Sequence, residues 1–504
     1  MIGPGDLCGL KVSIVGAARE GTALAQYLLC CGSRVTLTDS KPAASLQSQP
    51  RLAAHLAALQ GLPGLRLALG ETPADLLDVD VLFLSPGVPP TAPIVRQARE
   101  KGLPVSSEPR LFTQVCTAPI VGITGSSGKT TTTTLVGRML SAGGRNAWVG
   151  GNIGLPLTER LRASVSAGDG DERPQIAVME LSSFQLELFS PAYQGPTVHQ
   201  QRSAASRAIS VEGWSPQIAA ITNITPNHLD RHLSMEDYAR AKENILAFQS
   251  ADDWAILNLD DVLSRALRTR RDSRSRGVGR ALWFSLREPV AEGAFLWRGE
   301  LMLRFAGAEQ ALCRTGEVVL RGEHNVANVL AAACCAAAAG VGPEVIRQVA
   351  TTFTGVEHRL EVVRRWREIT FVNDSIATSP ERAIAALRSY AEPLVLLAGG
   401  RDKHLSWEEW ADLVWQRVRV VVAFGEARPI IERALFEARL RQRPDGRDQP
   451  LVKQVGSLEE AVAAAAGLAR TGEVVLLSPG GTSFDAFEDF EERGQRFREL
   501  VAAL

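Results

Sequence analysis

Short runs of β-branched and other apolar residues alternate with longer segments of helical period along almost the whole chain. Examples are KVSIVG at residues 11–16, PIVGITG at 119–125 and EVVLLSPG at 473–480. Such runs are apolar at successive positions, which is typical of strands buried on both faces of a parallel sheet. Helical segments between them are typical of crossover connections. The alternation therefore predicts an α/β fold built from βαβ units.

The strand-like runs fall into three groups, and 504 residues at ~150 residues per domain also predict about three domains. Three strands of the first group end in the turn signals Gly16, Asp39 and Ser85-Pro86-Gly87. Two stretches without the pattern, about 190–213 and 268–280, are interpreted as surface insertions in the second group. We predict a Rossmann-like N-terminal domain at 1–112, a central domain with a parallel sheet at 113–355, and a Rossmann-like C-terminal domain at 356–504.

The charge balance and the cysteines exclude several classes of protein. There are 55 Lys and Arg against 56 Asp and Glu, for a net charge of −1, which argues against a nucleic-acid partner. No apolar stretch reaches the ~20 residues of a membrane span, and the first residues do not resemble a signal peptide, so we expect a soluble, cytoplasmic protein without a membrane partner. The seven cysteines include no CxxC pair and are interpreted as reduced, mostly buried thiols.

The segment PIVGITGSSGKTTTT, residues 119–133, combines a buried strand, a glycine-rich turn, a lysine and a threonine run that opens a helix. Gly125 and Gly128 allow the backbone N–H groups to face phosphate oxygens. Lys129 can reach the β- and γ-phosphates, and the Thr130 hydroxyl can ligate Mg²⁺. The pattern GxxxxGK[ST] has glycine where this chain has Ile123, so we predict a variant phosphate loop for a nucleoside triphosphate, in a central domain resembling P-loop ATPases.

Acidic and histidine side chains follow two later strands of the central group. Glu180 ends the run IAVMELS, where a carboxylate beside a phosphate loop can hold Mg²⁺. The segment PNHLDRH then carries His228, Asp230 and His232, and Lys242 follows 14 residues after His228. Spacing alone leaves two readings of these residues open, a metal site and ordinary surface or core side chains.

The phosphate loop resembles the GxTGxxGK[ST]T loop of the Mur ligase family, the ATP-dependent amide ligases of peptidoglycan precursor synthesis. Motifs that resemble later segments of the same family follow in order. They are GGNIG at 150–154, ELSSFQLE at 180–187, TNITPNHLD at 222–230, GEHNVANVLAAA at 322–333, GVEHRLEVV at 355–363 and SPGGTSFDAFEDFEERG at 478–494. The resemblance covers the chain except the two predicted insertions.

For ATP and metal, the resemblance implies two Mg²⁺ ions and a specific set of residues. Glu180 and His228 would help to hold the second ion, and Lys242 would be carbamylated so that it becomes an anion beside a cation. Asn152 would lie near the substrate and the γ-phosphate, and His324 is on the helix that faces adenine. The implied catalytic residues are Lys129, His228, Lys242 and Asn152; the metal ligands are Thr130, Glu180, His228 and Lys242; the ATP-binding residues are Gly125, Ser126, Ser127, Gly128, Lys129, Thr130, Thr131, Asn325, Asn328, Arg359 and Asp374.

For the other two substrates, the resemblance implies sites in the first and third domains. The turn in KVSIVGAAREG is similar to GxGxxG, with Ala18 at the central glycine, and alone is weak evidence for a dinucleotide. In the family it holds the UDP of the muramoyl substrate, which implies contacts from Ala18, Arg19, Asp39, Ser40, Ser85, Pro86, Gly87 and Val88. The implied D-glutamate site comprises Thr378, Lys403, Ser483 and Phe484, with Phe490 as its aromatic wall.

The C-terminal motif resembles the D-glutamate-adding members most closely, and the DNPR motif of the diaminopimelate- or lysine-adding members is absent. The expected enzyme is a monomer that forms an acyl phosphate from UDP-N-acetylmuramoyl-L-alanine and ATP and then joins it to D-glutamate. Its domains should close around the substrates, because water would hydrolyse that intermediate.

Three alternatives remain open from the sequence. One is the L-alanine-adding member of the same family, and another is an NAD(P) dehydrogenase fused to an ATPase. The third is a catalytically silent relative, motivated by the insertion and by two departures from family motifs. Ser127 stands where the family often has Asn, and Ile376 stands where NDSKAT has Lys.

Overall fold

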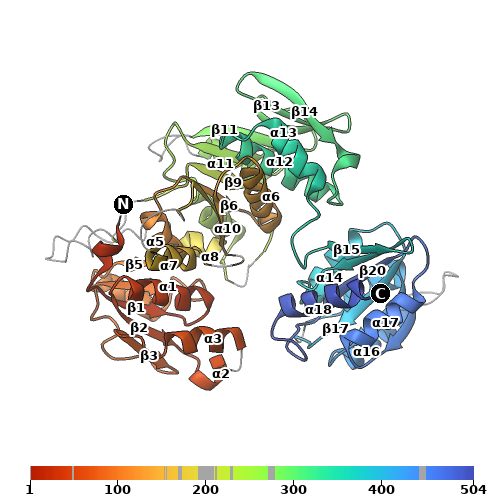
Figure 1. Cartoon of the computed structure of the whole chain (residues 1–504), viewed down its shortest axis with the longest axis horizontal. Helices are drawn as coiled ribbons and strands as arrows, with labels where there is room; N and C mark the ends of the chain where they lie inside the picture. The colour runs from red at the N-terminus through yellow and green to blue at the C-terminus, as the bar shows by residue number, and fades with distance from the viewer. Residues whose placement is uncertain are drawn as a thin grey trace. The chain divides into compact units, whose positions relative to one another are not determined.

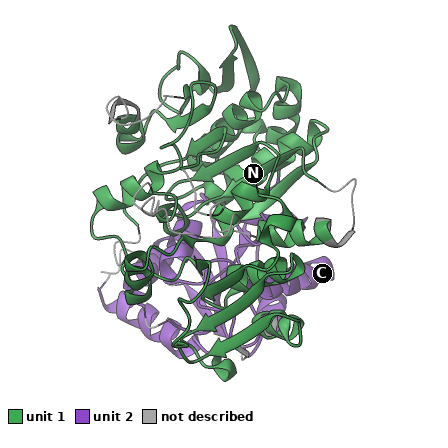
Figure 2. Cartoon of the chain, turned by 90° about the vertical axis from the view of Figure 1, so that its left-hand side faces the viewer, with its two compact units in different colours: residues 1–319, 323–353 green, residues 320–322, 354–504 purple. Residues whose placement is uncertain are grey.

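The computed structural model of this chain contains three β-sheets flanked by helices (Figure 1). It divides into two compact units, Met1–Val319 with Glu323–Phe353, and Leu320–Gly322 with Thr354–Leu504 (Figure 2). Two sheets belong to the first unit and one to the second, and the predicted three-domain boundaries stay a prediction. The structure describes residues 2–47, 50–152, 154, 156–167, 173–190, 209, 213–227, 231–270, 279–403, 405–441 and 450–504. His228, Asp230 and most of the two predicted insertions lie outside these residues.

The first sheet is parallel and has the strand order β3-β2-β1-β4-β5. The order reverses between β1 and β4, and a crevice at such a point is where open α/β sheets bind ligands. Two strands were not predicted, because β3 is a half-exposed edge strand and β5 has only two residues. The strands are β1 (Lys11–Val15), β2 (Arg34–Asp39), β3 (Leu65–Leu69), β4 (Val81–Leu84) and β5 (Val105–Ser106); the helices are η1 (Pro4–Leu7), α1 (Arg19–Cys30), α2 (Ala43–Gln47), α3 (Pro50–Leu59), α4 (Pro93–Glu100) and α5 (Glu108–Val115).

The second sheet has nine strands in the order β14-β13-β12-β11-β10-β9-β6-β8-β7. Seven neighbouring strands, from β7 to β12 in this order, pair in parallel, as predicted for the sheet. Of these, β6, β8, β9 and β10 were predicted, whereas β7, β11 and β12 were not, and neither were the antiparallel strands β13 and β14. The strands are β6 (Ile120–Thr124), β7 (Ala147–Gly151), β8 (Ile176–Glu180), β9 (Ile218–Ile221), β10 (Trp254–Asn258), β11 (Arg280–Ser285), β12 (Gly293–Trp297), β13 (Glu300–Phe305) and β14 (Ala308–Arg314). The helices are α6 (Lys129–Ala142), α7 (Leu157–Ala167), α8 (Ser183–Glu187), α10 (Met235–Glu243), α11 (Val262–Arg270), η4 (Thr315–Glu317), α12 (Glu323–Ala338) and α13 (Pro343–Thr352).

Two-residue turns explain these antiparallel strands. Arg298-Gly299 joins β12 to β13 and Ala306-Gly307 joins β13 to β14, and all four residues have positive φ angles of 50–82°. Positive φ at both central positions is the geometry that matches the twist of a hairpin. The usual sequence signals of such turns are Asn-Gly and Asp-Gly, so Arg-Gly and Ala-Gly gave little indication of them.

The third sheet has the order β15-β16-β20-β17-β18-β19, and all its pairs except β15–β16 are parallel. Helices cover both of its faces: along β17, Leu396 packs in one hydrophobic core and Leu397 in the other. This explains why LVLLAGG reads as a continuous apolar run. The strands are β15 (Glu361–Trp366), β16 (Ile369–Asn373), β17 (Leu394–Gly399), β18 (Val418–Phe424), β19 (Leu451–Gln454) and β20 (Val474–Gly480); the helices are α14 (Pro380–Arg388), α15 (Glu408–Arg417), α16 (Arg428–Arg441), α17 (Leu458–Leu468) and α18 (Phe490–Ala502).

The structure confirms the α/β fold class and the prediction for the cysteines. All seven cysteines are free, and five of them are buried. Cys334 and Cys335 are fully buried on α12, where small neighbours allow close packing. Among the described residues, no helix has the length and apolar character needed to traverse a lipid bilayer.

Candidate nucleotide and substrate site

The predicted phosphate loop connects the fully buried strand β6 to helix α6. Gly125 has a φ angle of +150°, and a Cβ atom there would lie 1.9 Å from the Thr222 hydroxyl oxygen. Gly128 caps α6 with a φ angle of +79°, and a Cβ atom there would lie 2.2 Å from the Asn328 side-chain oxygen. Both positions therefore require glycine, because any side chain would be strained and would collide.

The segment that follows β9 forms hydrogen bonds with this loop. The Ser126 amide donates to the Asn223 carbonyl at 2.9 Å, and the Ser127 amide donates to Asn223 Oδ1 at 3.0 Å. The Ser126 hydroxyl donates to the Thr225 carbonyl at 2.9 Å and accepts from the Tyr238 hydroxyl at 3.1 Å. The loop shape is thus fixed by a segment almost 100 residues away in sequence, and nucleotide binding by Ser126, Ser127 and the adjoining Thr131 stays a prediction.

A chain of hydrogen bonds links the loop to Glu180 and Asn152. Glu180 is 1% exposed; its Oε2 accepts from the Thr130 hydroxyl at 2.9 Å, and its Oε1 accepts from Asn152 Nδ2 at 2.9 Å. β7 pairs with β8 in a register that places Gly151 opposite Glu180, which brings Asn152 to the carboxylate. Lys129 Nζ donates to the carbonyls of Gly125 and Ser126 at 3.0 and 3.2 Å. Four of the predicted residues therefore meet at one end of the central sheet.

Lys242 reaches the same place from helix α10. Its side chain is 1% exposed, its Nζ donates to the Gly125 carbonyl at 2.8 Å, and it lies 4.5 Å from the centre of the Tyr238 ring. Burial, and secondarily the charge of Lys129, lower the pKa of Lys242 from 10.5 to about 6, although Glu180 opposes the shift. The amine is therefore mainly neutral near pH 7.

The oxygen atoms around the loop fit a hard divalent cation in part. Thr130 and Glu180 supply hydroxyl and carboxylate oxygens, which are the donor types that Mg²⁺ prefers. Within the described ranges no group of three or more His, Cys, Asp or Glu side chains is arranged to hold a metal, but His228 lies outside those ranges. His232 makes other contacts, with Ser183 Oγ at 3.0 Å and Glu187 Oε1 at 3.4 Å.

The predicted UDP-binding turns lie at the carboxyl ends of β1, β2 and β4. Gly16 has a φ angle of +106°, and its carbonyl accepts from the Ser85 hydroxyl at 2.9 Å. Asp39 accepts from the Ala17 and Lys41 amides, both at 2.9 Å, which fixes the carboxylate beside the turn. Ala18 caps α1, and Ala18, Arg19, Ser40 and Gly87 are exposed, while their contact with UDP stays a prediction. Pro86 and Val88 are half-buried in the turn after β4.

Contacts from α1 join the first sheet to the second. Arg19 Nη2 donates to the Asn152 carbonyl at 2.9 Å, and Gln185 Nε2 donates to Glu20 Oε1 at 2.8 Å. Glu20 is 8% exposed, and its other oxygen has no hydrogen-bond partner among the residues that the structure describes. Burial and the nearby Glu108 raise the pKa of Glu20 from 4.5 to about 8 against the charge of Arg19, so the carboxyl is mainly protonated at pH 7.

The sequence analysis did not identify two side chains, Glu20 and Arg231, that connect the first sheet to the second within the first unit. Glu20 follows the charged Arg19 at the start of α1, so the local sequence does not indicate that its carboxyl is buried. Arg231 donates to the carbonyl of Val88 at 3.4 Å and to Glu187 at 3.3 Å, so it ties the turn after β4 to the central part. No local pattern identified Arg231, because its partners are more than 40 residues away.

The second unit contains Asp374, which the resemblance assigns to ATP. The side chain is 4% exposed; Oδ2 accepts from the Ser478 hydroxyl at 2.9 Å and Oδ1 from the Leu360 amide at 3.2 Å. Burial raises the pKa of Asp374 from 3.8 to about 7. Arg359 is half-buried in the segment between two positive-φ residues, His358 and Leu360.

The predicted amino-acid site gathers three loops of the second unit. Lys403 Nζ lies 3.4 Å from the Thr378 hydroxyl, and burial together with Arg382 lowers the pKa of Lys403. Ser483 is 2% exposed and Phe484 is 55% exposed, so the aromatic ring is presented to solvent. Phe490 is half-buried at the start of α18, and its carbonyl accepts from the Ser375 hydroxyl at 2.7 Å.

The predicted adenine residues lie on α12 in the first unit. Asn328 Nδ2 donates to Asn325 Oδ1 at 3.1 Å, and the Asn328 oxygen faces Gly128 of the phosphate loop. His324, which directly precedes Asn325, is exposed. The proximity to Gly128 links α12 to the loop, while the contact with adenine remains a prediction.

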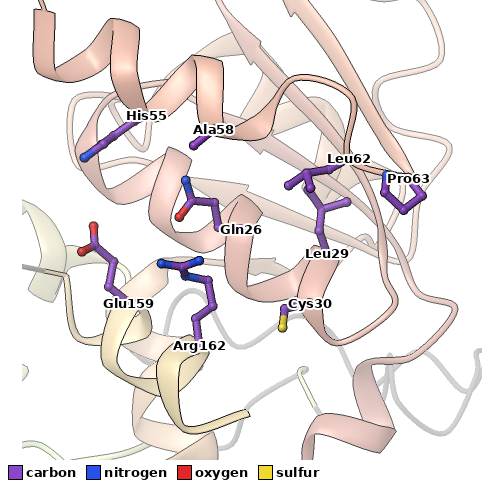
Figure 3. Close-up of a pocket in the computed structure, with 9 residues that line it drawn as sticks. All are labelled: Gln26, Leu29, Cys30, His55, Ala58, Leu62, Pro63, Glu159 and Arg162. Atoms are coloured by element: carbon purple, nitrogen blue, oxygen red, sulfur yellow. The ribbon is translucent and has the colours of Figure 1, made fainter. Parts of the chain in front are cut away.

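A pocket of about 520 Å³ opens elsewhere in the first unit, between α1, α3 and α7 (Figure 3). Figure 3 shows Glu159 and Arg162 projecting from α7 toward the side chains of the N-terminal part. None of the predicted site residues lines it. The lining residues are Gln26, Leu29, Cys30, His55, Ala58, Leu62, Pro63, Glu159 and Arg162.

Comparisons with known proteins agree on one family. Residues 123–195 and 201–336 match the family model for the Mur ligase middle domain, and residues 358–481 match that for the Mur ligase glutamate ligase domain. A protein of Symbiobacterium thermophilum named UDP-N-acetylmuramoylalanine--D-glutamate ligase is 40% identical over 496 residues, 98% of each chain. One of the same name from Acetivibrio thermocellus is 38% identical, covering 98% of this chain and 96% of its own.

Solved structures show the same fold at low sequence identity. UDP-N-acetylmuramate-alanine ligase from Thermotoga maritima is 18% identical, with a TM-score of 0.53 over 98% of this chain and 99% of its own. A UDP-N-acetylmuramoyl-L-alanyl-D-glutamate--2,6-diaminopimelate ligase is also 18% identical, with a TM-score of 0.53, and the match covers 93% of this chain and 92% of its own.

Proposed function

This chain belongs to the Mur ligase family, and we propose that it joins D-glutamate to UDP-N-acetylmuramoyl-L-alanine in an ATP-dependent reaction of peptidoglycan precursor synthesis. The observation that carries the proposal is the buried Glu180 carboxylate, which holds both Thr130 of the phosphate loop and Asn152. D-glutamate as the acceptor is supported by the relatives named UDP-N-acetylmuramoylalanine--D-glutamate ligase, which match almost the whole length of the chain. We expect the enzyme to act as a monomer in the cytoplasm, where ATP is available.

The first chemical step would be phosphorylation of the alanine carboxylate. A carboxylate oxygen attacks the γ-phosphorus, the bond to the bridging oxygen of the β-phosphate breaks, and ADP leaves. Lys129 would neutralise charge on the transferred phosphoryl group, which is how positioned cations lower such barriers, and its amine lies against the phosphate loop. Asn152 would orient the reacting oxygens, because Glu180 holds its side-chain Nδ2 and Arg19 holds its backbone carbonyl.

The second step would be attack by the amine of D-glutamate on the acyl phosphate. The nitrogen lone pair forms the C–N bond, the amine loses a proton, and the C–O bond to phosphate breaks. Lys403, Thr378 and Ser483, with Phe484 and Phe490, would hold the amino acid, since a cation and hydroxyls complement its carboxylates. Ala18, Arg19, Asp39, Ser40 and the turn after β4 would bind the UDP group in the first sheet's crevice. ATP would be bound by Asn325, Asn328, Arg359 and Asp374.

Magnesium would be held by Thr130, Glu180, His228 and Lys242 after carbamylation. When bound, it would supply further charge neutralisation at the phosphates. The environment of Lys242 supports the modification, because only a neutral amine adds CO₂, forming an N–C bond and releasing a proton. Its low pKa keeps the amine neutral near pH 7.

The test is phosphate release from Mg·ATP with UDP-N-acetylmuramoyl-L-alanine and one of D-Glu, L-Glu, L-Ala or diaminopimelate. We expect release that needs both the muramoyl substrate and D-Glu. Lys129→Ala should abolish it, whereas Lys101→Ala should not, because Lys101 is exposed and pairs with the exposed Asp78 at 3.7 Å. Release with another amino acid would replace the proposed acceptor, and the absence of release with every amino acid would favour a silent relative.

A further inference from the structure

Arg493 is a fully buried arginine on α18, with 0% of its side chain exposed. Its Nε donates to Ser375 Oγ at 3.0 Å, its Nη2 to the Ser375 carbonyl at 2.8 Å, and its Nη1 to the Gly481 carbonyl at 3.2 Å. All three acceptors are neutral atoms, and Arg493 forms no ion pair with any carboxylate of the described residues. Burial lowers the pKa of Arg493 to about 10 against the charges of Asp485 and Asp374, so the side chain remains charged at neutral pH.

The guanidinium lies where the three loops of the predicted amino-acid site meet. Ser375 begins the loop that carries Thr378, and Gly481 precedes Ser483. The third loop approaches most closely at Gly400, where a Cβ atom would lie 2.9 Å from Arg493 Nη1. That loop leads to Lys403 and pairs with the second, because Arg401 and Thr482 exchange backbone hydrogen bonds of 2.9 and 2.8 Å.

Burial of a cation without a paired carboxylate is unfavourable by several kcal/mol in general, and an apolar side chain would fill the same space without that cost. A need for packing alone therefore does not account for an arginine. Its planar fork directs donors to two loops in a fixed geometry, whereas lysine is a point charge on a flexible stem. Asp485 and Asp374 offset part of the Arg493 charge without forming an ion pair with it, and the remaining positive charge favours a ligand with carboxylates.

We propose that Arg493 is a positioning residue of the amino-acid site, which fixes the three loops and whose charge selects an acidic amino acid. The inference rests on the proposed D-glutamate ligase function. Arg493 acts through Ser375 and Gly481 and through its field, without touching the amino acid itself.

The kinetic test compares Arg493→Gln and Arg493→Lys with Arg496→Gln. Arg496 lies on the same helix, is 43% exposed and pairs with Glu459 at 2.8 Å, so it is a matched control. We expect Arg493→Gln to raise the KM for D-Glu about 10-fold or more, since a buried charged hydrogen-bonding group is lost. Arg493→Lys keeps the charge but not the fork, and its KM for D-Glu should rise by a smaller factor. The kcat value and the KM values for ATP and the muramoyl substrate should stay within about 3-fold of wild type.

Selectivity and hydrogen exchange provide independent readouts. The preference for D-Glu over D-Gln in kcat/KM should fall in Arg493→Gln and persist in Arg493→Lys. Amide exchange in residues 374–378, 400–403 and 481–483 should be faster in both Arg493 variants than in Arg496→Gln. Thermal unfolding of each variant establishes that it is folded, and the lysine variant carries the test if the glutamine variant does not fold.

Unchanged KM for D-Glu, or an equal rise in KM for all three substrates, would overturn the inference, and so would unchanged exchange in the three loops. A wild-type protein that releases no phosphate with D-Glu would instead refute the proposed function. In that case the exchange measurement still decides whether Arg493 positions the loops.

Discussion

Lys242 should be carbamylated in the active enzyme, and its burial sets the size of the effect. With a pKa of about 6, about 90% of the amine is neutral at pH 7, whereas a lysine with the ordinary value of 10.5 would be only about 0.03% neutral. The structure therefore increases the reactive fraction of this amine roughly 3,000-fold over an exposed lysine. Addition of CO₂ then converts this neutral amine into an anion, which the charge of Lys129 favours.

The variants separate the anion from the lysine itself. Lys242→Arg keeps a permanent positive charge and cannot be carbamylated, so we expect activity to fall about 100-fold, the size typical for groups that support a metal ligand set. Lys242→Glu restores a carboxylate and should retain more activity than Lys242→Arg. Lys101→Arg, at an exposed lysine, should leave activity unchanged.

The assay combines activity with direct detection of the carbamate. Enzyme stripped of bicarbonate should lose activity and regain it with ¹³C-bicarbonate, together with one carbamate signal by NMR that is absent in Lys242→Arg. Activity should also fall as the pH drops through about 6, because the amine then gains a proton. Full activity without bicarbonate and without that signal, or wild-type activity in Lys242→Arg, would refute the reasoning.

Other consequences concern stability and nucleotide binding. The native state keeps the proton of Glu20 up to about pH 8 while the unfolded chain loses it near 4.5, so stability should fall as pH rises across this window. Glu20→Gln should remove that dependence, and a Tm that changes with pH as in the wild type would contradict it. Gly128→Ala places a carbon 2.2 Å from the Asn328 oxygen at positive φ and should cost about 1–3 kcal/mol in urea unfolding, whereas Gly316→Ala, with open space around it, should not. Asp374 gains a proton as pH falls through about 7, so the KM for ATP should rise by about 10-fold over this pH range. In Asp374→Asn the KM for ATP should be high at every pH. A pH dependence of KM like that of the wild type in this variant would exclude a role of Asp374 in ATP binding.

Local pattern was sufficient for the strands that are buried on both faces and for the phosphate loop. Strands such as β6 and β17 are buried on both faces, and their continuous apolar runs identify them without knowledge of their partners. Gly125, Gly128, Lys129 and Thr130 lie within six consecutive residues, so their chemistry can be read from spacing alone. The hairpins of β12–β14 and of β15–β16 could not be predicted in this way, because Arg-Gly, Ala-Gly and Arg-Glu are weak turn signals.

The arrangement of the site required the tertiary structure. Lys242 and Gly125 are 117 positions apart, and Gln185 and Glu20 are 165 apart, so no local pattern could pair them. The sheet order places β8 beside β6, which brings Glu180 to the phosphate loop.

The sequence by itself determined the fold class, the nucleotide loop and the family motifs, because each depends on residues close together in the chain. Only the tertiary structure decided which charged groups are buried and what they contact. Glu20 and Arg493 are ordinary charged residues in the sequence, and only the family resemblance distinguished Lys242. Their unusual properties come from neighbours on distant elements that exclude water and supply or withhold compensating charge.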